Sequence, residues 1–473
     1  MITALDTAAG ALALFLGYGI YKRRKQSCPF PPGPKGLPIL GNSLQIPAKY
    51  PWKKYMEWSK QFDSDIIHLT APGNHIVVLN SLEAAIDLFG KKSTVYSDRP
   101  YLPMVCDLVG LSRWNLGLMP YGSDWRNARK MFNQYLGLQE SRLQRPKMVE
   151  YTHKLLRRLL SEPDRFLEHV RTGPGEFILD VAYGIKVAEP KNDSWLELAE
   201  AANEAARTAS APGHFLVDLL PFCAGFQRIA RELRQLNEDM YSLPFEDVKR
   251  RINYPHRRAK TLEGSAPESI TQAMLAGLDV TNIPDYEDYL MKCVTGVMYS
   301  AASDTERAQE EIDSVVHGER VPGIEDMLSL PYTTALVKEV MRWYPPTPQA
   351  VVRRNTEDDI HRGYIIPKGS IIIPNVWAMS RDCKAYPGDP GVFRPSRFLD
   401  ASGQMDSSVL DPAEFIFGFG RRICPGRYLA YDSMWTMMAS ILATFKISKC
   451  KGEEPLELYT TGHIIPDRVN MNN

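Results

Sequence analysis

The local sequence patterns predict a mainly helical chain with a smaller β region. Between about residues 140 and 258, apolar residues recur at helical spacing in segments that prolines separate. Short runs rich in β-branched residues occur near residues 66–79 and 351–374 and indicate strands. A glycine-rich loop at residues 417–426 leads into a further helical pattern. The 473 residues could form one large domain or two to three average ones.

The composition excludes several classes of protein. Hydrophobic residues make up 44% and charged residues 24%, which is ordinary for a globular chain. Lys+Arg and Asp+Glu both number 56, so no basic excess points to nucleic acid as a partner. The seven cysteines are scattered singly without a Cys-x-x-Cys pair. This pattern argues against a secreted disulfide framework and favours a reducing compartment.

The N-terminal segment predicts a membrane anchor. Residues 7–21 carry no charge and are followed at once by the basic cluster at residues 22–25. A secretory signal has its basic cluster before the apolar run, whereas this order predicts a single anchor with the body of the chain in the cytoplasm. The proline-dense stretch that follows predicts a stiff, extended connector. We therefore expect an anchor with its basic stop at 1–25, a hinge at 26–40 and one large domain at 41–473.

The first strands and the first capped helix are predicted from local patterns. Residues 66–69 and 76–79, with a turn at 72–74, predict a β-hairpin. Ser81 precedes apolar residues at helical spacing and is expected to cap a helix. Residues 123–130 begin with capping residues and start another helix.

The loop at residues 417–426 brings a cysteine to the start of a helix. Cys424 lies just before the helical pattern, where the helix dipole and unpaired N–H groups favour a thiolate. The glycines of the loop, Gly420 among them, allow the backbone to approach a flat object closely. Arg422 could pair with an anionic group at the edge of that object. For a lone cysteine, the alternative is a buried thiol beside a glycine turn.

This stretch resembles the haem-binding signature of cytochrome P450 monooxygenases, Phe-x-x-Gly-x-Arg-x-Cys-x-Gly. Every fixed position is matched, from Phe417 through Gly420, Arg422 and Cys424 to Gly426. The resemblance implies that Cys424 is the axial ligand of the iron of haem b, with Phe417, Gly420 and Arg422 at the cofactor. A thiolate ligand pushes electron density toward bound oxygen and favours O–O cleavage.

Three further residues are candidates for haem binding. Trp125 and Arg129 are four apart and share a helical face, where an indole N–H and a guanidinium suit a carboxylate. An amphipathic surface helix is the alternative on spacing alone. The pair resembles the family's Trp-x-x-x-Arg, which binds a haem propionate. Arg353 resembles the strand residue that binds a propionate, and residues 348–352 before it would line the wall of the pocket.

Residues 300–305 resemble the oxygen-activation motif of the family, with Ala302 in place of glycine. The resemblance implies that Asp304 and Thr305 relay protons to bound oxygen. After Thr305 the sequence departs from the family, and a block of roughly twenty residues, about 30 Å of helix, is missing. Locally, residues 303–306 form a capping box, which begins a helix rather than continuing one. Two readings stay open: a properly built relay, or a Thr305 misplaced in space.

The sequence also predicts a structural ion-pair triad. Glu339 and Arg342 are three apart on one helical face and can form a buried ion pair. Arg397 offers a second guanidinium to the same carboxylate. These residues resemble the family's Glu-x-x-Arg and Pro-Glu-Arg-Phe motifs, with Ser396 in place of glutamate. In the family this triad supports the cysteine loop and takes no part in catalysis.

The resemblance extends over nearly the whole chain and implies both fold and reaction. The implied fold is the cytochrome P450 fold, mainly α with a smaller β region, apparently lacking part of the long central helix and the helix after it. The implied reaction inserts one oxygen atom from O2 into a small hydrophobic substrate, such as a secondary metabolite, a terpenoid or an aromatic or xenobiotic compound. Its electrons come from NADPH through the membrane-bound NADPH-cytochrome P450 reductase. The pattern resembles fungal microsomal members most, which implies the endoplasmic reticulum membrane.

Three hypotheses on activity are consistent with the sequence. The first is a working monooxygenase. The second is a haem-binding but catalytically impaired, shortened form, because of the junction after Thr305. The third is a chain that uses haem without a reductase, as a peroxygenase or an isomerase.

Overall fold

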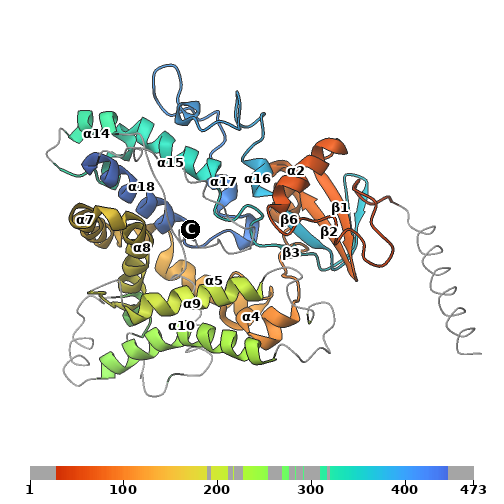
Figure 1. Ribbon diagram of the computed structural model, residues 1–473, viewed down its shortest axis with the longest axis horizontal. Coiled ribbons are helices and arrows are strands. Elements are labelled where there is room, and N and C mark those ends of the chain that lie inside the picture. The colour runs from red at the N-terminus through yellow and green to blue at the C-terminus, as the bar shows by residue number, and fades with distance from the viewer. Residues whose placement is uncertain are drawn as a thin grey trace, which may run out of the picture.

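The computed structural model describes residues 28–188, 193–210, 217, 227–253, 269–275, 283, 291, 309–316 and 320–445. Over these ranges the chain is mainly helical with a small sheet region, which confirms the predicted fold class. Figure 1 shows the sheet on the right of the molecule, α9 and α10 along the bottom, and α14, α15 and α18 at the upper left, above α7 and α8. The anchor at 1–25 lies outside the described residues, as do the junction after Thr305 and the residues on either side of it.

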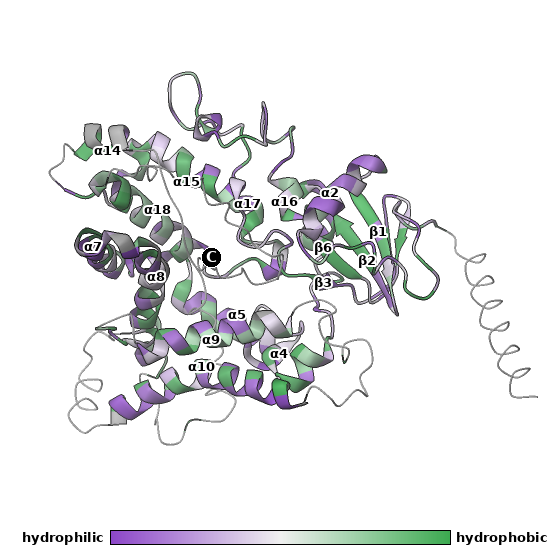
Figure 2. Ribbon diagram, in the orientation of Figure 1, coloured by the Kyte–Doolittle hydropathy of each residue, from purple (hydrophilic) through white to green (hydrophobic). Residues whose placement is uncertain are grey.

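A four-stranded sheet joins residues 66–79 to residues 353–374. Its strand order is β1-β2-β6-β3, and β4 and β5 form a separate two-stranded sheet. The predicted hairpin is confirmed, because β1 and β2 pair antiparallel, whereas β2 and β6 pair parallel with Val78 opposite Ile373. Figure 2 shows hydrophobic residues along β1, β2 and β6. The strands are β1 (Ile66–Ala71), β2 (Asn74–Leu79), β3 (Arg353–Arg354), β4 (Asp359–His361), β5 (Tyr364–Ile366) and β6 (Ile371–Pro374).

The helices fall into a group before residue 276 and a group that surrounds the cysteine loop. The first group comprises α2 (Pro51–Gln61), α3 (Leu82–Ala85), η1 (Ile86–Lys91), η2 (Met104–Leu108), α4 (Leu111–Trp114), α5 (Ser123–Leu136), α6 (Leu138–Arg142), α7 (Arg145–Ser161), η3 (Pro163–Arg165), α8 (Phe166–Tyr183), α9 (Ser194–Ala209), α10 (Gln227–Asn253) and α12 (Ile270–Leu275). The second group comprises α14 (Gln309–Val316), η6 (Ile324–Ser329), α15 (Pro331–Trp343), α16 (Val376–Met379), η7 (Pro395–Phe398), α17 (Ala413–Ile416), η8 (Gly420–Arg422) and α18 (Arg427–Thr444).

Local helix signals were correct in one place and wrong in two. Ser81 caps α3 as predicted, since its Oγ accepts a hydrogen bond from the N–H of Ala84 at 3.1 Å. Helix α5 begins at Ser123 as predicted, but its N-cap is Gly122 and no side chain caps it. Prolines were expected to break the helices of residues 140–258, yet Pro174 lies inside α8 and Pro244 inside α10. Each helix packs against several neighbours, and this packing overrides the local cost of the proline.

The described part of the proline-rich segment is extended and bound to the sheets. Its carbonyls accept hydrogen bonds from the N–H groups of His68 and Ile365, both at 2.9 Å. The Phe30 ring stacks on the His68 ring at 4.5 Å. Burial, and then the charge of His75, lowers the pKa of His68 to about 4, so this stack is uncharged near neutral pH. The segment therefore runs along the body of the protein from residue 28 onward.

A membrane-spanning helix needs about 20 consecutive, mainly apolar residues. In these ranges no helix combines the length and the apolar character needed to cross a bilayer. The predicted anchor precedes residue 28 and is not among them.

The helix that follows the cysteine loop is held by the core. Helix α18 packs against α7, α14 and α15. Trp435, which is completely buried, donates through Nε1 to the Thr334 hydroxyl of α15 at 3.1 Å. Met438 and Leu442 pack into the same hydrophobic cluster. These contacts fix the direction in which α18 leaves the loop.

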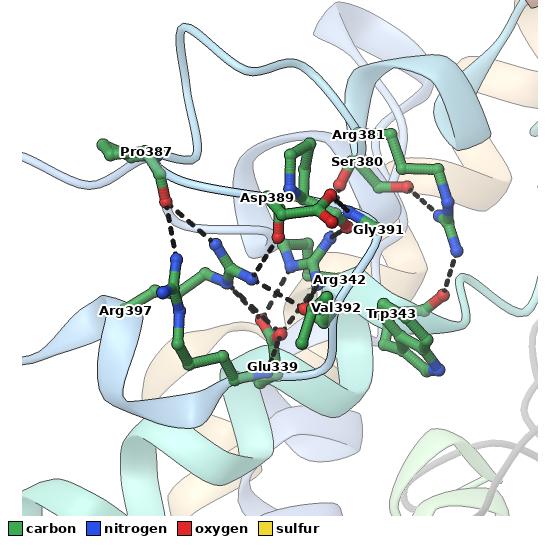
Figure 3. A network of polar contacts seen from close by, with 12 residues as sticks. Glu339, Arg342, Trp343, Ser380, Arg381, Pro387, Asp389, Gly391, Val392 and Arg397 are labelled. Carbon is green, nitrogen blue, oxygen red and sulfur yellow. Dashed lines mark hydrogen bonds and ion pairs between the residues drawn. The ribbon is translucent and has the colours of Figure 1, made fainter.

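The predicted triad of Glu339, Arg342 and Arg397 is present and is shielded from solvent (Figure 3). The side chains of Glu339 and Arg342 have no exposed surface, and that of Arg397 has 1%. Arg342 binds both oxygens of the carboxylate at 2.7 Å, and Nε of Arg397 approaches both at 3.2 Å. The N–H of Arg394 donates to the same carboxylate at 2.6 Å. The remaining guanidinium N–H groups donate to backbone carbonyls, so the triad joins α15 to η7 and to the loop of Ser380, Pro387, Asp389, Pro390 and Val392.

Candidate functional site

The cysteine loop is a tight backbone turn between α17 and α18. The N–H of Cys424 donates to the Phe417 carbonyl at 2.7 Å, which closes the loop at its base. Gly418 and Gly420 have φ values of 79° and 49°, in the left-handed region that favours glycine. A Cβ at Gly420 would lie 2.0 Å from the backbone oxygen of Phe89. The loop is therefore pressed directly against η1.

Cys424 lies three positions before the first residue of α18, just before the helix as predicted, and burial acts against ionisation of its thiol. Burial raises the pKa of Cys424. A hydrogen bond from the N–H of Gly426 and the charges of Arg129 and Arg427 act in the opposite direction and do not outweigh it. The N–H at the helix terminus therefore lowers the pKa of the thiol as predicted, but burial has the larger and opposite effect. A coordinating metal ion deprotonates a thiol outright, so a buried neutral thiol fits a metal ligand.

Arg353 reaches the cysteine loop from β3, whereas Arg422 belongs to the loop and reaches out of it. Arg353 opens β3, is 3% exposed, and donates through Nη2 to the Phe419 carbonyl at 2.6 Å. Its guanidinium also lies over the Phe89 ring at 4.1 Å. Arg422 donates through Nε to the Ser97 carbonyl at 2.8 Å. Nη1 of Arg353 and Nη2 of Arg422 are buried and have no partner among the described residues.

Arg99 is a third buried guanidinium that the sequence did not reveal. It donates through Nε to the Gly117 carbonyl at 2.7 Å, and through Nη1 to the carbonyls of Val351 and Val352 at 2.7 and 2.6 Å. These acceptors are 18 to 253 positions away. Neither helical nor strand spacing can indicate such partners, and an Arg-Pro pair in a loop is common.

The three arginines bury more positive charge than nearby carboxylates neutralise. Burial, and then the charges of Arg422 and Arg353, holds the pKa of Arg99 far below its ordinary value. Burial lowers the pKa of Arg353 to about 9 and that of Arg422 to about 10. Within the described ranges, Asp98 is the carboxylate that opposes these shifts for Arg99 and Arg422. Arginines stay charged under such conditions, so the cluster favours an anionic ligand.

Trp125 and Arg129 both lie at this cluster. Nε1 of Trp125 donates to the Leu116 carbonyl at 3.1 Å, so the indole N–H is engaged within the protein. The guanidinium of Arg422 lies over the Trp125 ring at 4.5 Å, which is a cation–π distance. Arg129 donates through Nη1 to the carbonyl of Ile423, next to the cysteine. The tryptophan thus orients Arg422, a contact that i,i+4 spacing did not predict.

The structure therefore brings together most of the predicted site residues. One region holds Cys424, Phe417, Gly420, Arg422, Arg353, Trp125 and Arg129. Its unpartnered guanidinium N–H groups suit the carboxylates of a planar anionic cofactor beside the thiol. Asp304 and Thr305 lie outside the described residues.

Comparisons with known proteins agree with this geometry. The sequence model of the cytochrome P450 family matches residues 31–305 and 297–469. The chain is 37% identical to cytochrome P450 monooxygenase ple1 of Rhodocybe pseudopiperita, over 97% of this chain and 90% of that protein. It is 38% identical to cytochrome P450 monooxygenase COX1 of Coprinopsis cinerea, over 96% and 93%. It is 33% identical to tryptamine 4-monooxygenase of Psilocybe cyanescens, over 90% and 88%.

Fold, site and relatives define the class of the protein as an oxidoreductase of the monooxygenase type, with haem iron as its cofactor. The chain belongs to the cytochrome P450 family, among fungal relatives.

Proposed function

We propose that this chain is a haem-thiolate monooxygenase in which Cys424 is the axial ligand of haem b. The observation that carries the proposal is the cysteine loop, which closes by the hydrogen bond from Cys424 to Phe417 beside buried cations. The bound haem supplies the activation of O2, and the substrate is a small hydrophobic compound such as a terpenoid, an aromatic compound or another secondary metabolite.

The protein's own residues would bind and orient the cofactor. The free N–H groups of Arg353 and Arg422 are placed to bind its carboxylates, and Arg129 adds a cation next to the thiol. Trp125 would hold Arg422 in position through its ring rather than through its N–H. Phe417 and Gly420 set the path of the loop. Asp304 and Thr305 as the proton relay remain a prediction.

A shortened, catalytically impaired form is the second candidate function. The two matched stretches of the family model meet and overlap at residues 297–305, which is where the sequence departs from the family. An interruption there would affect the relay residues and leave the cysteine loop intact. Such a chain would bind haem and turn over poorly.

One experiment on the full chain distinguishes these candidates. We expect the reduced protein with carbon monoxide to show the absorption band of a thiolate complex. We also expect NADPH with the P450 reductase to reduce the iron and to support oxygenation of terpenoid and aromatic test compounds. A thiolate band without oxygenation under either NADPH or peroxide would favour the impaired form. Oxygenation with peroxide alone would favour a peroxygenase, and absence of the thiolate band would refute the proposed ligand.

The same proposal includes attachment to the endoplasmic reticulum membrane through residues 1–25. Its support is the uncharged run at 7–21 with the basic cluster after it. We expect the full chain to stay in the membrane fraction after an alkaline carbonate wash, with its catalytic domain open to protease on the cytoplasmic side. A chain without residues 1–25 should be released by the wash. Release of both chains would contradict the anchor.

A further inference from the structure

A small cavity lies beside the arginine cluster, between the loop after Arg99 and the end of α9. It has a volume of about 30 Å³. A buried water molecule needs roughly 10–15 Å³ of cavity volume, so this cavity has room for about two waters or for one small functional group. Its walls are mainly apolar, and the residues that line it are Arg99, Pro100, Leu102, Val105, Cys106, Leu118, Ser210, Val351 and Val352.

The cavity is connected to the proposed haem site through β3. Val351 and Val352 line it and directly precede Arg353, which donates to the Phe419 carbonyl in the cysteine loop. Arg99 fixes this stretch by binding the carbonyls of both valines. The cavity therefore adjoins the residues proposed to hold the haem.

Ser210 supplies an unsatisfied polar group in this apolar wall. It lies directly after α9, is 3% exposed, and its Oγ has no hydrogen-bond partner among the described residues. A buried hydroxyl without a partner is costly, so such groups in native proteins usually meet a water or a ligand. Here the hydroxyl lines a cavity of the size of one functional group.

The local charge decides which functional group suits this hydroxyl. Arg99 lines the same cavity. The positive charges of Arg353 and Arg422 lie close enough to Arg99 to lower its pKa. A cationic ammonium group would be repelled by these guanidinium groups. A neutral oxygen acceptor, such as a carbonyl, accepts a hydrogen bond from the hydroxyl and places its negative end in the positive field of the guanidinium groups. An aliphatic end would leave Ser210 unpaired.

We propose that the substrate places a carbonyl or hydroxyl oxygen in this cavity and accepts a hydrogen bond from Ser210. This inference rests on the proposed monooxygenase function and deepens it. It defines the substrate class as apolar compounds that carry one carbonyl or hydroxyl group, and it excludes amines. The relative named tryptamine 4-monooxygenase would differ in this respect.

Matched probes test the proposal by equilibrium dialysis against the full-length holoprotein. The probes are menthone, p-menthane and menthylamine, and 2-decalone, decalin and 2-aminodecalin, so that only the polar group changes within each skeleton. We expect the wild-type protein to bind each ketone about threefold to tenfold more tightly than its hydrocarbon, the range that one neutral hydrogen bond gives. Each amine should bind more weakly than its ketone. In Ser210→Ala this ketone preference should disappear, while hydrocarbon affinity is unchanged.

A matched control is Ser440→Ala. Like Ser210, Ser440 is buried and its Oγ has no partner among the described residues. It lies within α18 and does not line the cavity. This variant should keep the full ketone preference. Thermal unfolding checks that both variants fold, and removing an unsatisfied hydroxyl should not destabilise either.

Four results would overturn the proposal. In the first, the wild type binds ketone and hydrocarbon equally, which would mean that the cavity holds water only. In the second, the ketone preference survives Ser210→Ala. In the other two, the amines bind more tightly than the ketones, or neither ketone binds. Failure of the proposed function is distinguished by the carbon monoxide spectrum of the same preparations. A missing thiolate band refutes Cys424 as the ligand, whereas a normal band with no ketone preference refutes only the role of Ser210.

Discussion

Glu339→Gln is expected to lower the free energy of unfolding by about 3–5 kcal/mol, the usual cost of removing one partner from a buried ion pair. The carboxylate is the shared acceptor of Arg342, Arg397 and the Arg394 N–H, and both guanidinium groups lack contact with water. A glutamine keeps the shape but removes the charge, and its amide hydrogens would face N–H donors. Two buried cations would then have no counter-charge and only neutral carbonyl oxygens as acceptors.

Urea unfolding followed by circular dichroism measures this effect. The control is Glu57→Gln. It removes the surface ion pair between Glu57 and Lys54, in which the side chain of Glu57 is 62% exposed. That change should shift stability by less than about 0.5 kcal/mol, because exposed ion pairs contribute little. If Glu339→Gln were as small in effect as the control, the triad would not be a structural support of the loop between Ser380 and Val392.

The triad shows how far sequence can predict such a network. Glu339 and Arg342 are three apart on a helix, so their contact follows from spacing, and Arg397 followed from the resemblance to the family. The carbonyls of Ser380 and Pro390, which satisfy Arg342, were not predictable. They come from a loop without periodicity, and their direction depends on how that loop packs on α15.

The candidate site was predicted to a similar extent. The position of Cys424 before a helix follows from the local helical pattern, and that of Arg353 on a strand was predicted from the resemblance to the family. The net rise in the pKa of the thiol and the partner of the Trp125 N–H were not predicted, since burial and the Leu116 carbonyl are tertiary features. Arg99 was missed for the same reason. The proton relay was predicted on residues outside the described ranges.

Gly420→Ala is expected to abolish the thiolate-type carbon monoxide spectrum by displacing the cysteine loop. The residue has a φ of 49°, which costs an alanine about 1–2 kcal/mol. The larger effect is steric, because the new Cβ would lie 2.0 Å from the Phe89 oxygen and 2.9 Å from its carbonyl carbon. Both neighbours are backbone atoms of η1 and cannot rotate away, so the loop must move and carry Cys424 with it.

The measurement is the haem content and the carbon monoxide spectrum of purified protein, with Cys424→Ala as the reference for complete loss of the ligand. The control is Gly173→Ala in α8, where the nearest atoms to the new Cβ belong to Leu155 at 3.7 Å, an ordinary contact. Alanine is also about 1 kcal/mol better than glycine inside a helix, so this variant should keep the full spectrum. A normal spectrum for Gly420→Ala would mean that the contact between the loop and η1 does not position the thiol. The sulfur would then be placed by α18 and the Phe417 hydrogen bond alone.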